Sequence, residues 1–357
     1  MSARARRVGP TALDVARLAG VAPATAARVL GNYGSVSSAA RERVLKAAAT
    51  LRYRPNRVAR SMVTGLTQTL GVVIANIEDE FFSRIVRGIA DAARVAGFQV
   101  MLMNSDEDVD EESRAVHALM ERQVDGLIVA PASARTPEHL LEVRESGMPI
   151  VLLDRTLDGL DADAVVIDGF EAATDVVNYL IELGHRRIAI ITDVPGSTAL
   201  PSVTELANRV VTTGARLAGY LRALEQAGVD ADDQLIGRAV PTVAGAREAT
   251  HALVARSAPT AIFATDNTMT LGVLEGLQER RVEIPGEVSL FGFDDLEWTK
   301  VASPPLSVVA QPMYDLGLTA ARSLLARIRG LDEPPRAHVL PTNLVHRGST
   351  GRPRPKG

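Results

Sequence analysis

The sequence of 357 residues contains no cysteine, which excludes disulfide bonds, thiolate catalysis and metal sites with cysteine ligands. Aromatic residues make up only 4%, with a single tryptophan, against 46% hydrophobic residues, so the core must be built from aliphatic side chains. Apolar runs such as LGVVIA and GLIVAP are too short to span a bilayer. The basic N-terminus leads into no apolar segment and predicts no secretory signal. We therefore expect a cytoplasmic protein of two or more domains.

Lysine is also scarce, and the basic charge, mostly arginine, is unevenly distributed. Residues 1–62 hold twelve basic side chains but only two acidic ones, Asp14 and Glu42, a charge of +10. Because the whole chain carries −4, the remaining residues must carry −14. A basic head on an acidic body favours a nucleic-acid-binding module joined to a domain that does not bind nucleic acid.

The basic head has a helical pattern. Thr11 is placed to cap a first short helix, Gly20 breaks it, and Pro23 can begin a second helix that continues to Leu30. Two short helices across a tight glycine turn predict a helix-turn-helix, whose second helix enters the major groove of DNA. A third helix is expected over residues 38–51, with a face that completes the small core: Val44, Leu45, Ala48 and Leu51.

The body alternates short aliphatic runs with amphipathic stretches. This alternation predicts parallel sheets covered by helices on both faces, an α/β fold. The expected strands are 70–75, 98–103, 126–130, 149–153, 187–191, 260–264 and 287–292. The expected helices are 82–96, 111–122, 137–146, 170–183, 213–227, 244–255, 267–280 and 313–328.

Several motifs then occur in a recognisable order: ALDVARLAGVAPATAARVL, YRPNRVARSMVTG, ELGHRRIAII, RLAGYLRAL, ATDNTMTLGVLEGL and LPTNLVHRGST. In order and approximate spacing they resemble the LacI/GalR family of bacterial transcription repressors. The resemblance implies a periplasmic-binding-protein-like body of two doubly wound α/β lobes between which the chain crosses three times. The expected parts are a head at 1–54, a hinge helix and linker at 55–67, an N-terminal lobe at 68–168 plus 310–341, a C-terminal lobe at 169–309 plus 342–350, and a disordered tail at 351–357.

The resemblance places DNA contacts on the head. Pro23, Ala24 and Arg28 occupy the base-facing positions of the second helix and Thr25 a phosphate-facing one, with Thr11 also expected to bind DNA. Pro23 lacks a donor and Ala24 can contact only a thymine methyl, whereas arginine can donate two hydrogen bonds to guanine O6 and N7. Direct readout should therefore depend mainly on Arg28.

The resemblance also implies DNA contacts from the hinge and one weakness in the head. Asn56 and Arg57 are expected to contact DNA, and Met62 occupies the position of an apolar wedge that enters a base step. Relatives usually have serine where this chain has Ala22. The lost hydroxyl cap should cost the second helix roughly 1 kcal/mol.

Effector contacts carry over to the body in the same way. A carboxylate, an arginine and aromatic faces are what a polyhydroxylated ring needs for hydrogen bonding and stacking. Two departures from the family pattern occur here: Asp79 and Glu80 make the rim more acidic in EDEFF, where relatives often have NPFF, and Asp266 lies in a TDN that replaces a common xND. Trp298 could supply a flat apolar wall. The expected effector-binding residues are Phe81, Phe82, Asp154, Arg216, Asp266, Asp294 and Trp298.

Other classes of protein fit less well. An enzyme is disfavoured because the sequence contains no glycine-rich phosphate loop, no nucleophile elbow and no paired histidines at metal spacing, so we predict no catalytic site, metal or cofactor. An exported sugar-binding protein would carry no basic head. We predict a homodimeric repressor of carbohydrate-utilisation genes that binds a palindromic double-stranded DNA operator and a sugar effector, without membrane contact. The same scaffold with a non-sugar effector such as a purine, or with the ligand as a corepressor, remains an alternative.

Overall fold

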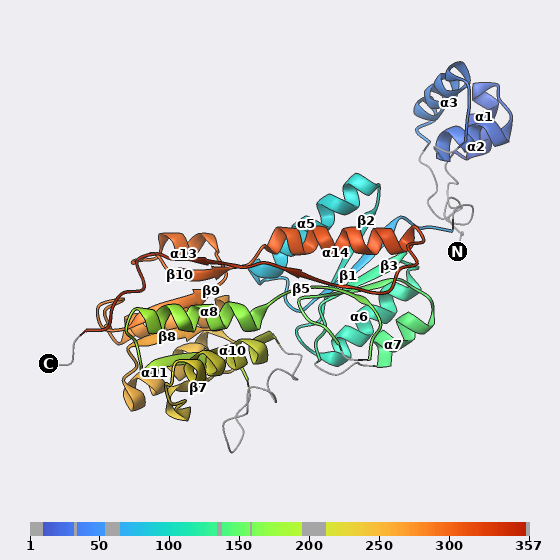
Figure 1. Ribbon diagram of the computed structural model, residues 1–357. Coiled ribbons are helices and arrows are strands. Elements are labelled where there is room, and N and C mark those ends of the chain that lie inside the picture. Colours follow the sequence, from blue (N-terminus) through green and yellow to red (C-terminus); the bar gives the residue numbers. More distant parts are fainter. Residues whose placement is uncertain are drawn as a thin grey trace, which may run out of the picture. The chain divides into compact units, whose positions relative to one another are not determined.

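The computed structural model describes residues 10–31, 34–53, 65–133, 138–157, 159–194 and 212–354. The chain divides into two compact units, Met1–Gln68 and Thr69–Gly357, called here the head and the body (Figure 1). The predicted hinge contacts Asn56, Arg57 and Met62 lie outside the described residues. Within those residues, no helix combines the length and the apolar character that a membrane span requires.

The described part of the head contains three helices, α1 (Ala12–Ala19), α2 (Pro23–Gly31) and α3 (Ser38–Thr50). Thr11 caps α1 in a reciprocal box: its side chain accepts from the Asp14 amide, and the Asp14 carboxylate accepts from the Thr11 amide at 2.9 Å. Gly20 ends α1 with φ of 62°, a conformation that costs glycine little. The predicted helix-turn-helix is confirmed.

A small aliphatic core holds the three helices together. Val15 and Ala16 from α1 pack against Val29 from α2 and Val44 from α3, all buried. The prediction for Leu45 is wrong, because its side chain is 52% exposed. Residues 40, 44 and 47 form the inner stripe of α3 at helical spacing, which turns position 45 outward.

The body contains two six-stranded sheets, which confirms the predicted α/β class. The first sheet has the order β11-β5-β4-β3-β1-β2 and the second β12-β10-β9-β8-β6-β7; all pairs are parallel except β10 with β12. The first sheet consists of β1 (Thr69–Ile74), β2 (Gln99–Asn104), β3 (Gly126–Val129), β4 (Ile150–Leu153), β5 (Asp163–Ile167) and β11 (Ala337–Leu340). The second consists of β6 (Ile188–Thr192), β7 (Ile236–Arg238), β8 (Ala261–Ala264), β9 (Ser289–Phe293), β10 (Ser307–Ala310) and β12 (Asn343–Val345).

Helices cover both faces of each sheet, as parallel strands require. The first lobe has α5 (Glu80–Ala96), α6 (Val109–Glu121), α7 (Glu138–Glu145) and α14 (Met313–Ile328). The second has α8 (Gly169–Glu182), α10 (Thr212–Gln226), η1 (Asp233–Leu235), α11 (Val243–Ser257), α12 (Asn267–Glu279) and α13 (Glu297–Val301). The helices α5 and α14 pack side by side, as do α8 and α10 (Figure 1).

The chain passes between the two sheets three times, after β5, after β10 and after β11. The lobes are therefore discontinuous in sequence, with α14 and β11 returning to the first lobe. The carboxyl ends of parallel strands in the two lobes lead to the space between them, where ligands bind in doubly wound folds.

The last described residues correct one expectation. The predicted disordered tail begins at residue 351, but residues 351–354 are held against the second lobe. The Gly351 amide donates to Ser289 Oγ at 3.0 Å, and its carbonyl accepts from His185 Nε2 at 2.8 Å. Arg354 pairs with Glu283. The buried ring of His185 thus has a structural role at the end of α8.

Candidate functional site

The exposed face of α2 presents the residues predicted to contact DNA. Pro23, Ala24 and Arg28 are exposed and Thr25 is half-buried, whereas Ala26 and Val29 of the same helix face the core. The structure therefore brings the predicted base-facing residues onto one solvent-facing surface. Whether they contact DNA stays a prediction.

Two details of the head bear on that surface. The Thr11 hydroxyl donates to Asp14 Oδ2 at 2.7 Å within the α1 cap, so its hydrogen-bonding capacity is already used partly by the fold. At the start of α2, the Thr25 and Ala26 amides bond to the Ala22 carbonyl at 2.9 and 3.1 Å. The alanine side chain cannot accept from the first-turn amides, which leaves this helix end without a side-chain cap of its own.

A cavity of about 280 Å³ lies between the two lobes of the body. Three of its aspartates immediately follow strand ends: Asp154 follows β4, Asp193 comes after β6 and Asp294 follows β9. Two further aspartates cap helices that point at the cavity, Asp79 on α5 and Asp266 on α12. The size is at the small end of the range for small-molecule sites.

The structure brings six of the seven predicted effector-binding residues together in the lining of this cavity: Phe81, Phe82, Asp154, Arg216, Asp266 and Asp294. Trp298 is not among the lining residues. Its half-buried ring packs against the hydrophobic clusters of both lobes instead, so it lies where the lobes meet rather than in the cavity. Effector binding by any of them remains a prediction.

Arg216 is the central cation of the site and is only 4% exposed. Its guanidinium lies 3.7 Å from the centroid of the Phe293 ring and donates to the Thr265 carbonyl. Among the described residues no ion pair includes Arg216, and its buried Nε has no hydrogen-bond partner. Stacking and the carbonyl bond thus fix the guanidinium while a donor remains for a ligand.

The carboxylates of the cavity resist ionisation because they are buried. Burial raises the pKa of Asp294 to about 7, opposed by the charge of Arg216 and by the hydrogen bond from Gln311 Nε2 at 2.6 Å. Burial likewise raises the pKa of Asp266 to about 6, and it raises the pKa values of Asp79 and Asp154. Neighbouring aspartates add to the shift of Asp294 and Asp266 by like-charge repulsion.

Further polar atoms around the cavity lack partners. Thr213 Oγ1, Asp193 Oδ1 and Gln311 Oε1 are buried without a hydrogen bond in the part of the chain that the structure describes. Unpaired buried polar groups are costly, so a site with several of them is suited to a ligand with many hydroxyl groups. The arrangement can bind and orient a polyol.

Comparison with known proteins agrees with this two-part architecture. A model for bacterial regulatory proteins of the lacI family matches residues 11–56, and a model for the periplasmic binding protein-like domain matches residues 177–350. Catabolite control protein A of Priestia megaterium is 35% identical over 315 residues, covering 88% of this chain and 91% of that protein. The chain belongs to the LacI family.

Two solved structures of this LacI family extend the comparison. The transcriptional regulator CelR in complex with cellobiose shares 31% identity with a TM-score of 0.70, covering 96% of this chain and 100% of that one. The lac repressor dimer bound to operator and the anti-inducer ONPF shares 26% identity with a TM-score of 0.82, again covering 96% and 100%. The predicted family and its fold are thereby confirmed.

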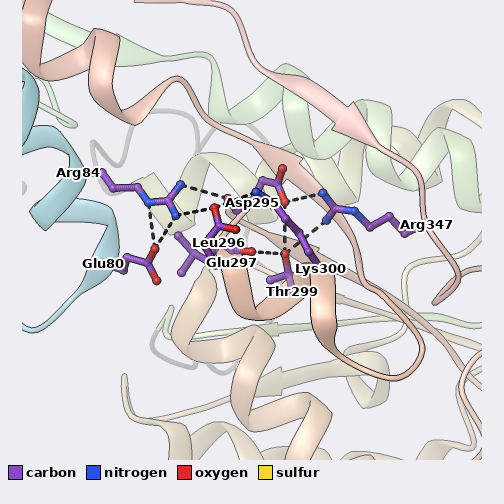
Figure 2. Close-up of polar contacts among 8 residues, drawn as sticks. All are labelled: Glu80, Arg84, Asp295, Leu296, Glu297, Thr299, Lys300 and Arg347. Carbon is purple, nitrogen blue, oxygen red and sulfur yellow. Dashed lines mark hydrogen bonds and ion pairs between the residues drawn. The ribbon is translucent and has the colours of Figure 1, made fainter.

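A polar network links the lobes beside the cavity of this LacI-family body (Figure 2). Arg84 of α5 bonds to Glu80 at 2.6 Å and reaches the second lobe at Glu297, 3.4 Å away, and at the Asp295 carbonyl, 3.5 Å away. From the opposite side of Asp295, Arg347 pairs with its carboxylate at 2.7 Å.

Sequence analysis missed several lining residues. Asp193 follows a buried strand in IAIITD, as Asp154 does in IVLLD, so the same strand-end pattern could have found it. Gln311 follows β10 in the same manner. Asn267, which donates to Asp79 at 2.9 Å across the cleft, had no comparable signal.

Proposed function

We propose that this LacI-family chain is a non-enzymatic repressor of carbohydrate-utilisation genes that acts in the cytoplasm as a homodimer. It binds a palindromic operator through α2 and a small polyhydroxylated effector, a sugar, in the cavity between the lobes. The observation that carries the proposal is a cavity rich in unpaired polar atoms in the body of a chain with a helix-turn-helix head. The similar structures hold an operator in one case and cellobiose in another.

The chemistry of the cavity favours a sugar. Carboxylates accept from vicinal hydroxyls, the fixed guanidinium of Arg216 donates to a ring or hydroxyl oxygen, and Phe81 and Phe82 offer apolar surface to C–H faces. These groups come from both lobes. A ligand that contacts them together favours one lobe arrangement over another.

Hydrogen bonds across the cleft give such a ligand a means of control. Asn267 Nδ2 donates to Asp79 at 2.9 Å, and the Thr212 hydroxyl donates to Asp154 at 3.3 Å. An effector that replaces these bonds with its own has different affinities for different lobe arrangements. Differential affinity is what shifts a conformational equilibrium, and so changes operator binding through the two heads.

A screen tests the proposal directly. Trp298 is the single tryptophan and lies in the body, so its fluorescence follows unfolding of the body. A sugar at ~100 times its dissociation constant should stabilise the body by about 2.7 kcal/mol. Operator affinity should then change on adding that sugar. If no sugar stabilises the protein and a purine does, the proposed effector class is wrong.

Arg216→Met provides the matched variant, because it keeps an apolar stem against Phe293. We expect effector binding to weaken by ~1–3 kcal/mol, since a buried acceptor loses its donor, with operator affinity unchanged in the absence of effector. Arg222→Met on the same helix is the control, as Arg222 is exposed and pairs with the exposed Glu225 at 3.3 Å. Unchanged effector affinity in Arg216→Met would show that the effector binds at a site other than this cavity.

A further inference from the structure

We infer that the effector carries a protonated amine on its polyhydroxylated ring, as in an amino sugar or an aminocyclitol. This inference rests on the proposed function and concerns the same cavity. It follows from an imbalance of charge: among the residues that the structure describes, seven acidic side chains line the cavity against two arginines, Arg155 and Arg216.

One of the two arginines is already neutralised by the protein. Arg155 pairs with Glu107 at 2.7 Å and approaches Asp154 at 3.7 Å. Within the described residues of the lining, Arg216 is the other arginine, and it forms no ion pair with Asp79, Asp193, Asp266 or Asp294. A neutral sugar would leave this excess of negative charge in place, whereas an ammonium group would offset part of it.

Three of these carboxylates are close enough to repel one another. Asp79 raises the pKa of Asp266 and of Asp294, and Asp266 raises that of Asp294. The Asn267 side-chain amide bridges two of them, because it donates to Asp79 at 2.9 Å and to Asp294 at 3.4 Å. An ammonium has three N–H donors and no acceptor, so it can serve several carboxylates where a hydroxyl donates only once.

The caps leave oxygen atoms for such a donor. Asp79 Oδ1 accepts from the Phe81 amide at 2.8 Å, and Asp266 Oδ1 accepts from the Met269 amide at 2.7 Å. In the described part of the chain, Oδ2 of neither residue has a hydrogen bond. The buried Thr213 Oγ1 and Arg216 Nε of the same cavity, which have no partner among the described residues, are suited to the ring hydroxyls.

The helix caps do not account for the charge of two of these carboxylates. Asp79 and Asp266 cap α5 and α12, and both line the cavity. A helix cap alone does not require this charge, because asparagine caps a helix as well as aspartate does. The charge is therefore available for a cationic ligand.

Matched ligand sets test the inference on the full-length protein by isothermal titration. Each set contains a hexosamine, its N-acetyl derivative and the parent hexose, beginning with glucosamine and galactosamine, and aminocyclitols are compared with inositols. We expect the free amine of at least one set to bind about tenfold more tightly than its neutral partners, a difference of about 1.4 kcal/mol. In Asp79→Asn and Asp266→Asn this preference should fall toward unity while both caps are retained. Asp232→Asn, which alters the cap of η1 outside the cavity, should keep it.

The outcomes separate this inference from the proposed function. If neutral sugars bind as tightly as amines or more tightly in every set, the inference is overturned and the sugar site stands. If no polyol of either kind binds, the sugar site fails and the inference with it. An amine preference that persists in both asparagine variants also overturns the inference, because these carboxylates would not be its source.

Discussion

Replacing Asp294 with asparagine should stabilise the effector-free body, and more so at higher pH. Asp294 is 2% exposed, and burial raises its pKa to about 7 from the usual 3.8. The native state therefore holds a proton that the unfolded chain releases. The contribution of this group to stability is fully present below pH 3.8 and is lost as the pH rises through 7.

The magnitude follows from the size of the shift. A shift of about three units corresponds to roughly 4 kcal/mol when the loss is complete. Of this, about 2.6 kcal/mol should be lost between pH 5 and pH 8. Asparagine cannot ionise, keeps the shape of the side chain, and retains an oxygen that can accept from Gln311 Nε2. The gain from Asp294→Asn should thus be larger at pH 8 than at pH 5.

Denaturant unfolding followed by Trp298 fluorescence at pH 5, 6, 7 and 8 measures this difference. Asp163→Asn is the control. Burial opposes ionisation of Asp163, but Arg327 at 2.7 Å and the Arg336 amide lower its pKa below the usual value. Asp163 is ionised in both states above pH 5, so the effect of its replacement should not vary over this range. An Asp294→Asn effect that is equally independent of pH would refute the reasoning.

Two predictions concern the head. Ala22→Ser should raise the free energy of unfolding of the head by ~1 kcal/mol, because the hydroxyl can accept from a first-turn amide of α2. Circular dichroism of the isolated head and of the full-length protein would measure the change. A loss of stability would contradict the assigned cap position. Arg28→Ala should weaken binding to the selected operator by ~1–3 kcal/mol per half-site and relax the base preference there. Arg17→Ala, on α1, is the control and should leave the base preference intact. Selection from random DNA with each variant compares them, and an unchanged preference in Arg28→Ala would contradict a role for Arg28 in base readout.

The sequence predicted the interior of the body well because burial leaves a strong signal there. Strand β6 is buried throughout and β1 from Leu70 onward, and both are rich in aliphatic residues. Several of the described helices begin at a capping aspartate or threonine, as α5 and α11 do. Strands β5, β7, β10, β11 and β12 were not predicted. The edge strand β11 alternates between exposed and half-buried residues, and β7 and β12 have only three residues each, so none offers an aliphatic run.

The cavity was predictable where it depends on strand ends and not where it depends on contacts between distant segments. Asp154 and Asp294 follow aliphatic strands, a local pattern that the sequence displays. The bond from Asn267 to Asp79 joins residues 188 positions apart. The stacking of Arg216 on Phe293 joins helix α10 to strand β9. Trp298 was predicted to line the effector site because of its flat apolar ring. From α13, however, the ring packs against the hydrophobic clusters of the two lobes.

The two arginines that flank Asp295 should differ sharply in their effect on stability. Arg347 is 18% exposed and its partner Asp295 24%, and Arg347 also donates to the Leu306 carbonyl at 2.9 Å. Arg84 is 34% exposed, and its partner Glu297 is 73% exposed. Removing a charged partner from a mostly buried carboxylate costs more than breaking an exposed pair, which water and salt already screen.

Arg347→Met should therefore lower the free energy of unfolding of the body by ~2 kcal/mol, and Arg84→Met by less than about 1 kcal/mol. Trp298, on the same short helix as Thr299, reports both transitions. Raising the salt concentration should reduce the effect of Arg84→Met further and leave that of Arg347→Met nearly unchanged. Equal losses for the two variants would show that exposure does not rank these contacts. Of the two arginines, Arg84 is the one that joins α5 to the second lobe, so the small loss expected for Arg84→Met implies that this link between the lobes is weak.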